Sequence, residues 1–131
     1  VEFLGQVEDE KLPELYGQAQ ATIVASEDED FGIVPVESMA AGTPVIAPQA
    51  GGFLETVVDP SVNSGQAGKT GVFYPSTGLG QVTMDSLTEV LRNFDPSNFK
   101  SSDCINQAKK FSSERFKKEI LDLIKRNSPP F

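Results

Sequence analysis

Short apolar runs alternate along the first part of the chain with segments whose apolar side chains recur at helical spacing. A short continuous apolar run is typical of a strand. Residues 21–25 read Ala-Thr-Ile-Val-Ala, and such a run suits a strand covered on both faces of a parallel sheet. Four runs predict strands: 1–4, 21–25, 44–47 and 72–74.

Helices are predicted between these runs from apolar spacing and from boundary residues. Apolar or aromatic residues follow Leu12 at three, four and seven positions, which places them on one helical face. Asp9 or Glu10 is a candidate cap for this helix. Segment 35–41 predicts a short helix with Pro35 at its first position and a glycine just past its end.

The second half of the chain continues this alternation. Gly51-Gly52 predicts a turn into a short helix, and the composition of residues 59–70 predicts a loop. Apolar spacing then predicts helices over about 83–127, with Thr83 as a candidate cap. Alternating strands and helices predict an α/β fold, a Rossmann-like parallel sheet with flanking helices. A chain of 131 residues is one domain or a piece of one.

Composition excludes several kinds of site. Cys104 is the one cysteine and there is no histidine, so the chain holds no internal disulfide and no cysteine or histidine zinc site. A Ser-His-Asp or Cys-His triad within this chain is excluded for the same reason. The acidic run 27–30 lacks the spacing of a calcium loop, so we expect no metal and interpret the run as a solvated loop.

Charge and hydropathy bear on partners and location. The net charge of −8 argues against nucleic acid or an anionic membrane as the partner of this chain. Residues 1–60 hold 12 acids and one base, a net of −11, whereas residues 61–131 carry a net of +3. No run approaches the roughly 20 apolar residues of a membrane span, and no N-terminal signal pattern is present. We therefore expect a cytoplasmic protein whose natural start lies before Val1.

The segment that follows the second predicted strand carries the candidate chemistry. It reads Glu29-Asp-Phe-Gly-Ile-Val-Pro-Val-Glu37, in which a strand end leads through a glycine turn into a helix N-terminus. Unpaired N–H groups and the positive end of the helix dipole favour an anion there. Gly32 lacks a Cβ, so a bulky ligand can approach the backbone. Carboxylates accept hydrogen bonds from hydroxyls, so a sugar-bearing phosphate fits this segment.

This segment resembles a known signature. A glutamate, seven residues and a second glutamate, continuing as Ser-Met-Ala-Ala-Gly-Thr-Pro-Val-Ile-Ala, is similar to the motif of the retaining GT-B glycosyltransferases of family four, the glycosyl transferases group one. The likeness lies in their C-terminal nucleotide-sugar domain. It covers roughly residues 1–126 and is specific through Gly52. Further stretches match in order: 3–7, 12–19, Gly51-Gly52 with Glu55, and Thr70-Gly71.

The resemblance implies a role for each matching residue. It implies that Glu29 contacts the donor sugar near the anomeric centre, as the catalytic residue, and that Glu37 holds the ribose hydroxyls. The reaction would retain anomeric configuration, with the leaving diphosphate assisting the acceptor hydroxyl and no side-chain general base. The backbone N–H groups that would meet the sugar and diphosphate are those of Phe31, Gly32, Ile33 and Val34.

The resemblance also implies where the base of the nucleotide lies. It places the base near Val7 to Asp9, where the carboxylate of Asp9 or Glu8 pairs with guanine. GDP-mannose is therefore the first expectation for the donor, followed by UDP-glucose or a UDP-N-acetylhexosamine. No cofactor is implied beyond this nucleotide-sugar substrate. The parent function would be a hexosyltransferase, such as a mannosyltransferase of polysaccharide biosynthesis.

The chain departs from the family pattern at its N-terminal side. The family's C-terminal domain begins with two further βα units, whose Arg and Lys clamp the diphosphate, and neither precedes Val1. We therefore expect residues 1–131 to be a single partial domain, inactive on its own and prone to self-association. A carbohydrate or lipid-linked acceptor would bind through the N-terminal domain, and the parent protein could contact a membrane peripherally.

Simpler interpretations stand beside these. Glu37 alone would be a first-turn glutamate stabilised by the helix dipole, Glu29 a solvated loop acid, and Asp9 a helix cap. Two other functions are also compatible with the sequence. One is a GT-B nucleotide-sugar epimerase, and the other is a non-catalytic nucleotide-binding or interaction module.

Overall fold

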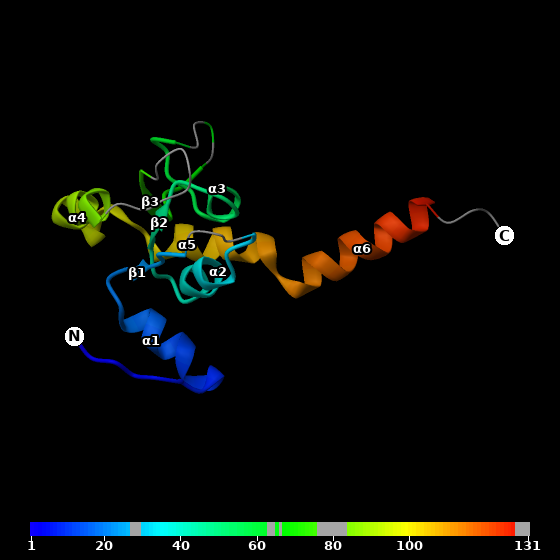
Figure 1. Cartoon of the computed structure of the whole chain (residues 1–131). Helices are drawn as coiled ribbons and strands as arrows, with labels where there is room; N and C mark the ends of the chain where they lie inside the picture. Colours follow the sequence, from blue (N-terminus) through cyan, green and yellow to red (C-terminus); the bar gives the residue numbers. More distant parts are fainter. Residues whose placement is uncertain (27–29, 63–64, 66, 76–83, 128–131) are drawn as a thin grey trace.

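A three-stranded parallel sheet forms the centre of the molecule (Figure 1). The computed structural model describes residues 1–26, 30–62, 65, 67–75 and 84–127. The strand order is β1-β2-β3, with Thr22 opposite Val45 and Val45 opposite Gly71. The strands are β1 (Thr22–Ile23), β2 (Val45–Pro48) and β3 (Gly71–Tyr74).

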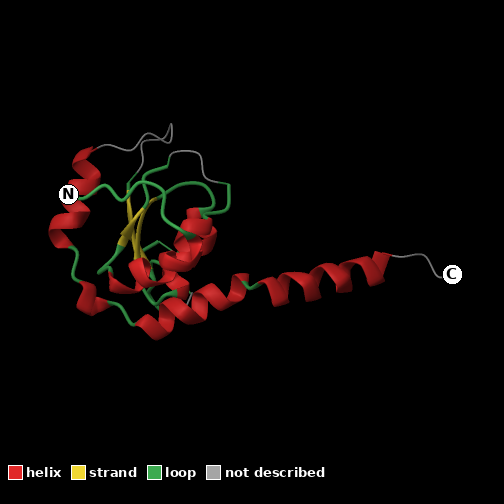
Figure 2. Ribbon diagram, turned by 90° about the horizontal axis from the view of Figure 1, so that it is seen from below, coloured by secondary structure: helices red, strands yellow, loops and turns green. Residues whose placement is uncertain are grey.

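Helices lie on both sides of this sheet (Figure 2). Alternation of strands and helices thus gives the α/β, Rossmann-like arrangement that the sequence predicts. Three 3₁₀ turns extend or link the helices of the described part. The α-helices are α1 (Leu12–Gln18), α2 (Ile33–Ala40), α3 (Phe53–Thr56), α4 (Met84–Asn93), α5 (Ser101–Ala108) and α6 (Ser113–Asn127), and the 3₁₀ turns are η1 (Asp9–Lys11), η2 (Pro96–Asn98) and η3 (Lys109–Phe111).

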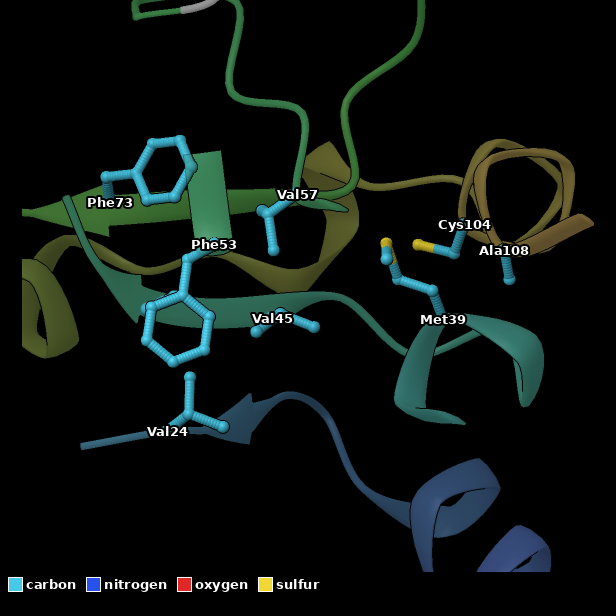
Figure 3. Close-up of a cluster of buried hydrophobic side chains, with 9 residues drawn as sticks. Val24, Met39, Val45, Phe53, Val57, Phe73, Cys104 and Ala108 are labelled. Carbon is cyan, nitrogen blue, oxygen red and sulfur yellow. The ribbon is translucent and has the colours of Figure 1, made fainter. Parts of the chain in front are cut away.

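The hydrophobic core lies between the sheet and helices α2, α3 and α5 (Figure 3). All four residues of β2 are buried, because this strand has a neighbour on each side. The Tyr74 hydroxyl, also buried, donates a 2.8 Å hydrogen bond to the carbonyl of Val24 and so ties β3 to the end of β1. The core cluster consists of Val24, Met39, Val45, Ala47, Phe53, Val57, Phe73, Cys104 and Ala108.

One strand prediction near the N-terminus is wrong. Residues 1–4 form no strand, and Phe3 is 94% exposed, because no neighbouring strand in the described part lies beside them to pair with their backbone. The run 21–25 contains β1, as predicted. Only the expectation that this strand is covered on both faces is corrected, since Ile23 is 46% exposed whereas the next residue, Val24, is buried.

Helix boundaries follow the predictions with one correction. Helix α2 begins at Ile33, so Pro35 occupies the third helical position and not the first. The predicted C-terminal end of this helix is confirmed, since Ala41 is the C-cap and Gly42 follows it with φ +87°. Thr83 lies outside the described residues, as does part of the predicted loop 59–70.

Candidate functional site

Gly32 sets the geometry of the motif between Glu29 and Glu37. It is the N-cap of α2 and adopts φ +84°, a left-handed conformation that glycine tolerates. A Cβ at this position would lie 3.2 Å from Thr56 Oγ1 and 3.3 Å from Phe53 Cδ1. The missing Cβ therefore faces α3, which corrects the expectation that it makes room for a ligand.

Gly52 supports the same turn from the other side. A Cβ on Gly52 would lie 2.5 Å from the carbonyl oxygen of Asp30 and 2.7 Å from Phe31 Cα. The turn at 51–52 thus packs directly on the backbone of the motif, and any side chain there would push the two segments apart.

The N-terminus of α2 carries the predicted phosphate-binding backbone. Within the described part of the chain no side chain caps this end, and Val36 N–H donates to the Gly32 carbonyl at 3.4 Å. Phe31 lies edge-on to Phe111, with ring centroids 5.6 Å apart. Phe31, Ile33 and Val34 are all exposed at this end of the helix. Glu29 lies outside the described residues.

The structure places Glu37 and Asp9, two acids predicted to contact the nucleotide, at the same pocket. Asp9 and Glu37 line one pocket of about 380 Å³, formed where α1 packs against α2. Glu37 lies four residues after the first residue of α2, which is about one helical turn, or roughly 6 Å. The remaining lining residues are Leu12, Pro13, Tyr16, Ala40 and Ala41.

Asp9 does not cap a helix. It is the first residue of η1, whose N-cap is Glu8, and the N-cap of α1 is Lys11. Neither N-cap position has a side-chain capping hydrogen bond, so the cap interpretation of Asp9 is wrong. Its exposed carboxylate instead faces the pocket that Glu37 shares.

Tyr16 is the pocket residue that sequence reasoning missed as a functional candidate. Its hydroxyl donates a 3.2 Å hydrogen bond to Glu37 Oε2. Burial raises the pKa of Tyr16, and the charge of Glu37 and this hydrogen bond raise it further. The helical spacing identified Tyr16 only as a residue on the packed face of α1.

Val7 is placed apart from this pocket. It lines a second hollow of about 450 Å³ together with Gln6 and Lys11, and Glu37 and Asp9 are not among the residues that line it. Lys11, the one base in residues 1–60, forms a 2.9 Å ion pair with Glu8.

No group of three or more His, Cys, Asp or Glu side chains among the described residues could hold a metal ion. No helix in the same part of the chain is both long enough and apolar enough to cross a membrane.

Comparison with known proteins identifies the family. Residues 1–111 match the model described as Glycosyl transferases group 1. A D-inositol 3-phosphate glycosyltransferase of Nocardioides sp. is 30% identical over 126 residues, which is 96% of this chain and 26% of that protein. An uncharacterized glycosyltransferase of Methanocaldococcus jannaschii is 46% identical over 57 residues, or 44% of this chain and 15% of that protein.

A third relative carries a more specific name. Mannosylfructose-phosphate synthase of Agrobacterium fabrum is 39% identical over 57 residues, covering 44% of this chain and 13% of that protein. The chain therefore spans between 13% and 26% of the length of these three relatives. Because the family model covers most of the chain, this protein belongs to the glycosyl transferases group 1 family.

Proposed function

We propose that this chain is the donor-binding part of a retaining glycosyltransferase that transfers a hexose, mannose in the first instance, from a nucleotide-sugar to an acceptor hydroxyl. The observation that carries the proposal is the pocket shared by Asp9 and Glu37, one helical turn from the N-terminus of α2, where Ile33 and Val34 are exposed. The nucleoside occupies this pocket, and the diphosphate meets the first backbone N–H groups of α2.

The ribose and the base of the donor each have a chemically suitable partner. The carboxylate of Glu37 accepts hydrogen bonds from the ribose hydroxyls. Asp9 accepts hydrogen bonds from N1 and N2 of guanine, which favours GDP over UDP as the nucleotide. The Agrobacterium relative is a mannosylfructose-phosphate synthase, which supports mannose as the transferred sugar.

The chemical step needs no side-chain base from this chain. The bond between the anomeric carbon and the diphosphate oxygen breaks, and the acceptor oxygen bonds to that carbon on the same face. The acceptor proton passes to the leaving diphosphate oxygen, so atoms and charge balance. Glu29 acts on the sugar near the anomeric centre. The acceptor, a carbohydrate or a lipid-linked sugar, binds outside this chain, and the reaction takes place in the cytoplasm.

The test of nucleotide binding is Glu37→Ala in the full-length protein. Loss of a charged hydrogen bond costs roughly 1.5–3 kcal/mol, so the affinity for GDP or UDP falls by about 10- to 150-fold. Calorimetry measures this affinity. The matched control is Glu89→Ala, because Glu89 is an exposed helical glutamate in α4. An unchanged affinity in Glu37→Ala rejects the assignment.

The test of sugar chemistry is Glu29→Gln. A group that acts on the reacting sugar changes turnover more than binding, so kcat falls by at least ~10-fold while GDP binds as before. Collapse of nucleotide affinity with preserved turnover would mean that the two glutamates have exchanged roles. Transfer to an acceptor separates the proposal from an epimerase, which alters free donor, and from a non-catalytic module, which turns over nothing.

A further inference from the structure

The hydrogen bond between Tyr16 and Glu37 joins the two helices that form the nucleoside pocket. Its donor lies in α1 and its acceptor in α2, 21 positions along the chain, and the oxygen atoms are 3.2 Å apart. We propose that Tyr16 is a positioning residue for donor binding, whose hydroxyl holds the Glu37 carboxylate in the orientation that accepts the ribose hydroxyls. This inference rests on the proposed function.

Tyr16 is itself held in place through its backbone. The Thr43 hydroxyl donates a 2.6 Å hydrogen bond to the Tyr16 carbonyl, and Ala19 N–H donates to the same oxygen at 3.0 Å. Thr43 lies just past α2, so the end of α1 is anchored to the segment that follows the Glu37 helix. The phenol ring therefore has a defined position relative to Glu37.

Glu37 needs such a partner because it is exposed. A solvent-exposed glutamate side chain samples several rotamers, and only some of them point both oxygens to one ligand. A donor on Oε2 restrains the carboxylate while Oε1 and the remaining lone pair of Oε2 stay able to accept ribose hydroxyls. A carboxylate oriented before the ligand arrives loses less conformational freedom on binding.

The chemistry of Tyr16 suits a permanent donor. Burial, the Glu37 charge and the hydrogen bond all raise its pKa above the ordinary tyrosine value. The hydroxyl is consequently protonated at every pH at which the protein would be assayed. The pocket residues Leu12, Pro13 and Ala40 are apolar, and Asp9 is the other carboxylate that lines this pocket.

The experiment is a double-mutant cycle between Tyr16→Phe and Glu37→Ala in the full-length protein, with GDP and UDP as probes in calorimetry. Tyr16→Phe keeps the ring and its packing but removes the hydroxyl. The loss of one hydrogen bond weakens nucleotide affinity by about 2- to 12-fold and raises the donor KM with little change in kcat. In the Glu37→Ala background, Tyr16→Phe has no further effect.

A matched control separates positioning from general destabilisation. Tyr74→Phe also removes one tyrosine hydroxyl, but that hydroxyl donates to the Val24 carbonyl in the core. The Tyr74→Phe substitution is expected to lower the midpoint of thermal unfolding and to leave the nucleotide affinity unchanged. Repeating the cycle with Glu37→Asp, whose shorter side chain draws the carboxylate away from the Tyr16 hydroxyl, covers the case in which Glu37→Ala fails to fold.

The outcomes distinguish this inference from the function on which it rests. If Glu37→Ala weakens binding but Tyr16→Phe has no effect, or the same effect in both backgrounds, Tyr16 does not act through Glu37 and the inference is overturned alone. If neither variant changes GDP or UDP affinity, the proposed nucleoside site is overturned as well. Coupling confined to the Tyr16 and Glu37 pair supports both the positioning role of Tyr16 and the proposed nucleoside site.

Discussion

Gly32 meets a backbone constraint and a packing constraint at the same time. Its φ of +84° costs an L-residue roughly 1–2 kcal/mol, and the position of a Cβ is already bounded by Thr56 and Phe53. Gly32→Ala is therefore expected to lower the free energy of unfolding by more than the backbone cost alone. The turn would shift as it relieves these contacts, so nucleotide binding should weaken too.

Gly65 offers the matched control for this prediction. It also has a left-handed φ, +94°, but a Cβ there meets no heavy atom within 4 Å among the described contacts. Gly65→Ala should lose only the backbone contribution, and the difference between the two variants isolates the contacts with α3. Urea denaturation of both variants checks this. Equal losses of unfolding free energy in the two variants would show that Thr56 and Phe53 can move away from the new Cβ with no energetic penalty.

The candidate site residues differ in how far the sequence could reveal them. Glu37 and Asp9 stand out because they belong to a motif or to an acidic cluster. Tyr16 does not, since its partner lies 21 positions away and the contact depends on how α1 crosses α2. Residue type and spacing predict which helical face Tyr16 occupies, whereas the target of its hydroxyl follows only from tertiary packing.

Among the elements, those whose signal is local were predictable. The runs at β2 and β3 are strands because they pair with each other in parallel and their apolar residues join the core, and α1 follows its apolar spacing. Residues 1–4 carry the same apolar signal, but a strand also requires a neighbour to pair with. The start of α2 depends on the conformation of Gly32, which boundary preferences alone placed two residues too late.

Helix α6 is an element without tertiary support in the described structure. It extends away from the rest of the molecule (Figure 1), and none of its residues is buried. Its apolar face, which includes Phe116 at 65% and Leu123 at 57% exposure, lies open to solvent. A 15-residue helix of this kind is only marginally stable by itself in water.

Deletion of residues 113–131 should therefore leave the stability of the remaining chain almost unchanged. We expect the free energy of unfolding to change by no more than about 0.5 kcal/mol, because none of residues 113–127, the described part of this segment, is buried. Denaturant titration of the full and shortened chains measures the difference. A loss of several kcal/mol would mean that α6 folds back onto the body in solution.

At the scale of the whole molecule, the exposed surface is larger than the chain length requires. The accessible area is 9077 Å², whereas a compact monomer of 14.1 kDa exposes about 6,700 Å². The excess comes from extended parts such as residues 1–7 and α6, both rich in exposed apolar side chains. The edge of β1 is also unpaired within the described structure. Such surfaces favour self-association of the chain.

The first 60 residues carry charge of the wrong sign for the proposed donor. Residues 1–60 have a net charge of −11, and their one base, Lys11, is paired with Glu8. Helix N-terminal amides contribute only about 0.3–1 kcal/mol per charge at an exposed site, against about 4.1 kcal/mol for a dissociation constant of 1 mM. The 131-residue chain is therefore expected to bind GDP- or UDP-sugars more weakly than ~1 mM.

Ligand-observed NMR titration and light scattering of the same sample check this expectation together. Because like charges oppose binding, added salt should strengthen the residual affinity instead of weakening it, since screening acts on the repulsion between exposed charges. Scattering should report species larger than 14.1 kDa, in keeping with the exposed apolar face of α6. Micromolar binding of a nucleotide-sugar by a monomer, weakened by salt, would contradict the prediction. It would require a cation source among the ten bases of residues 61–131 to reach the α2 N-terminus.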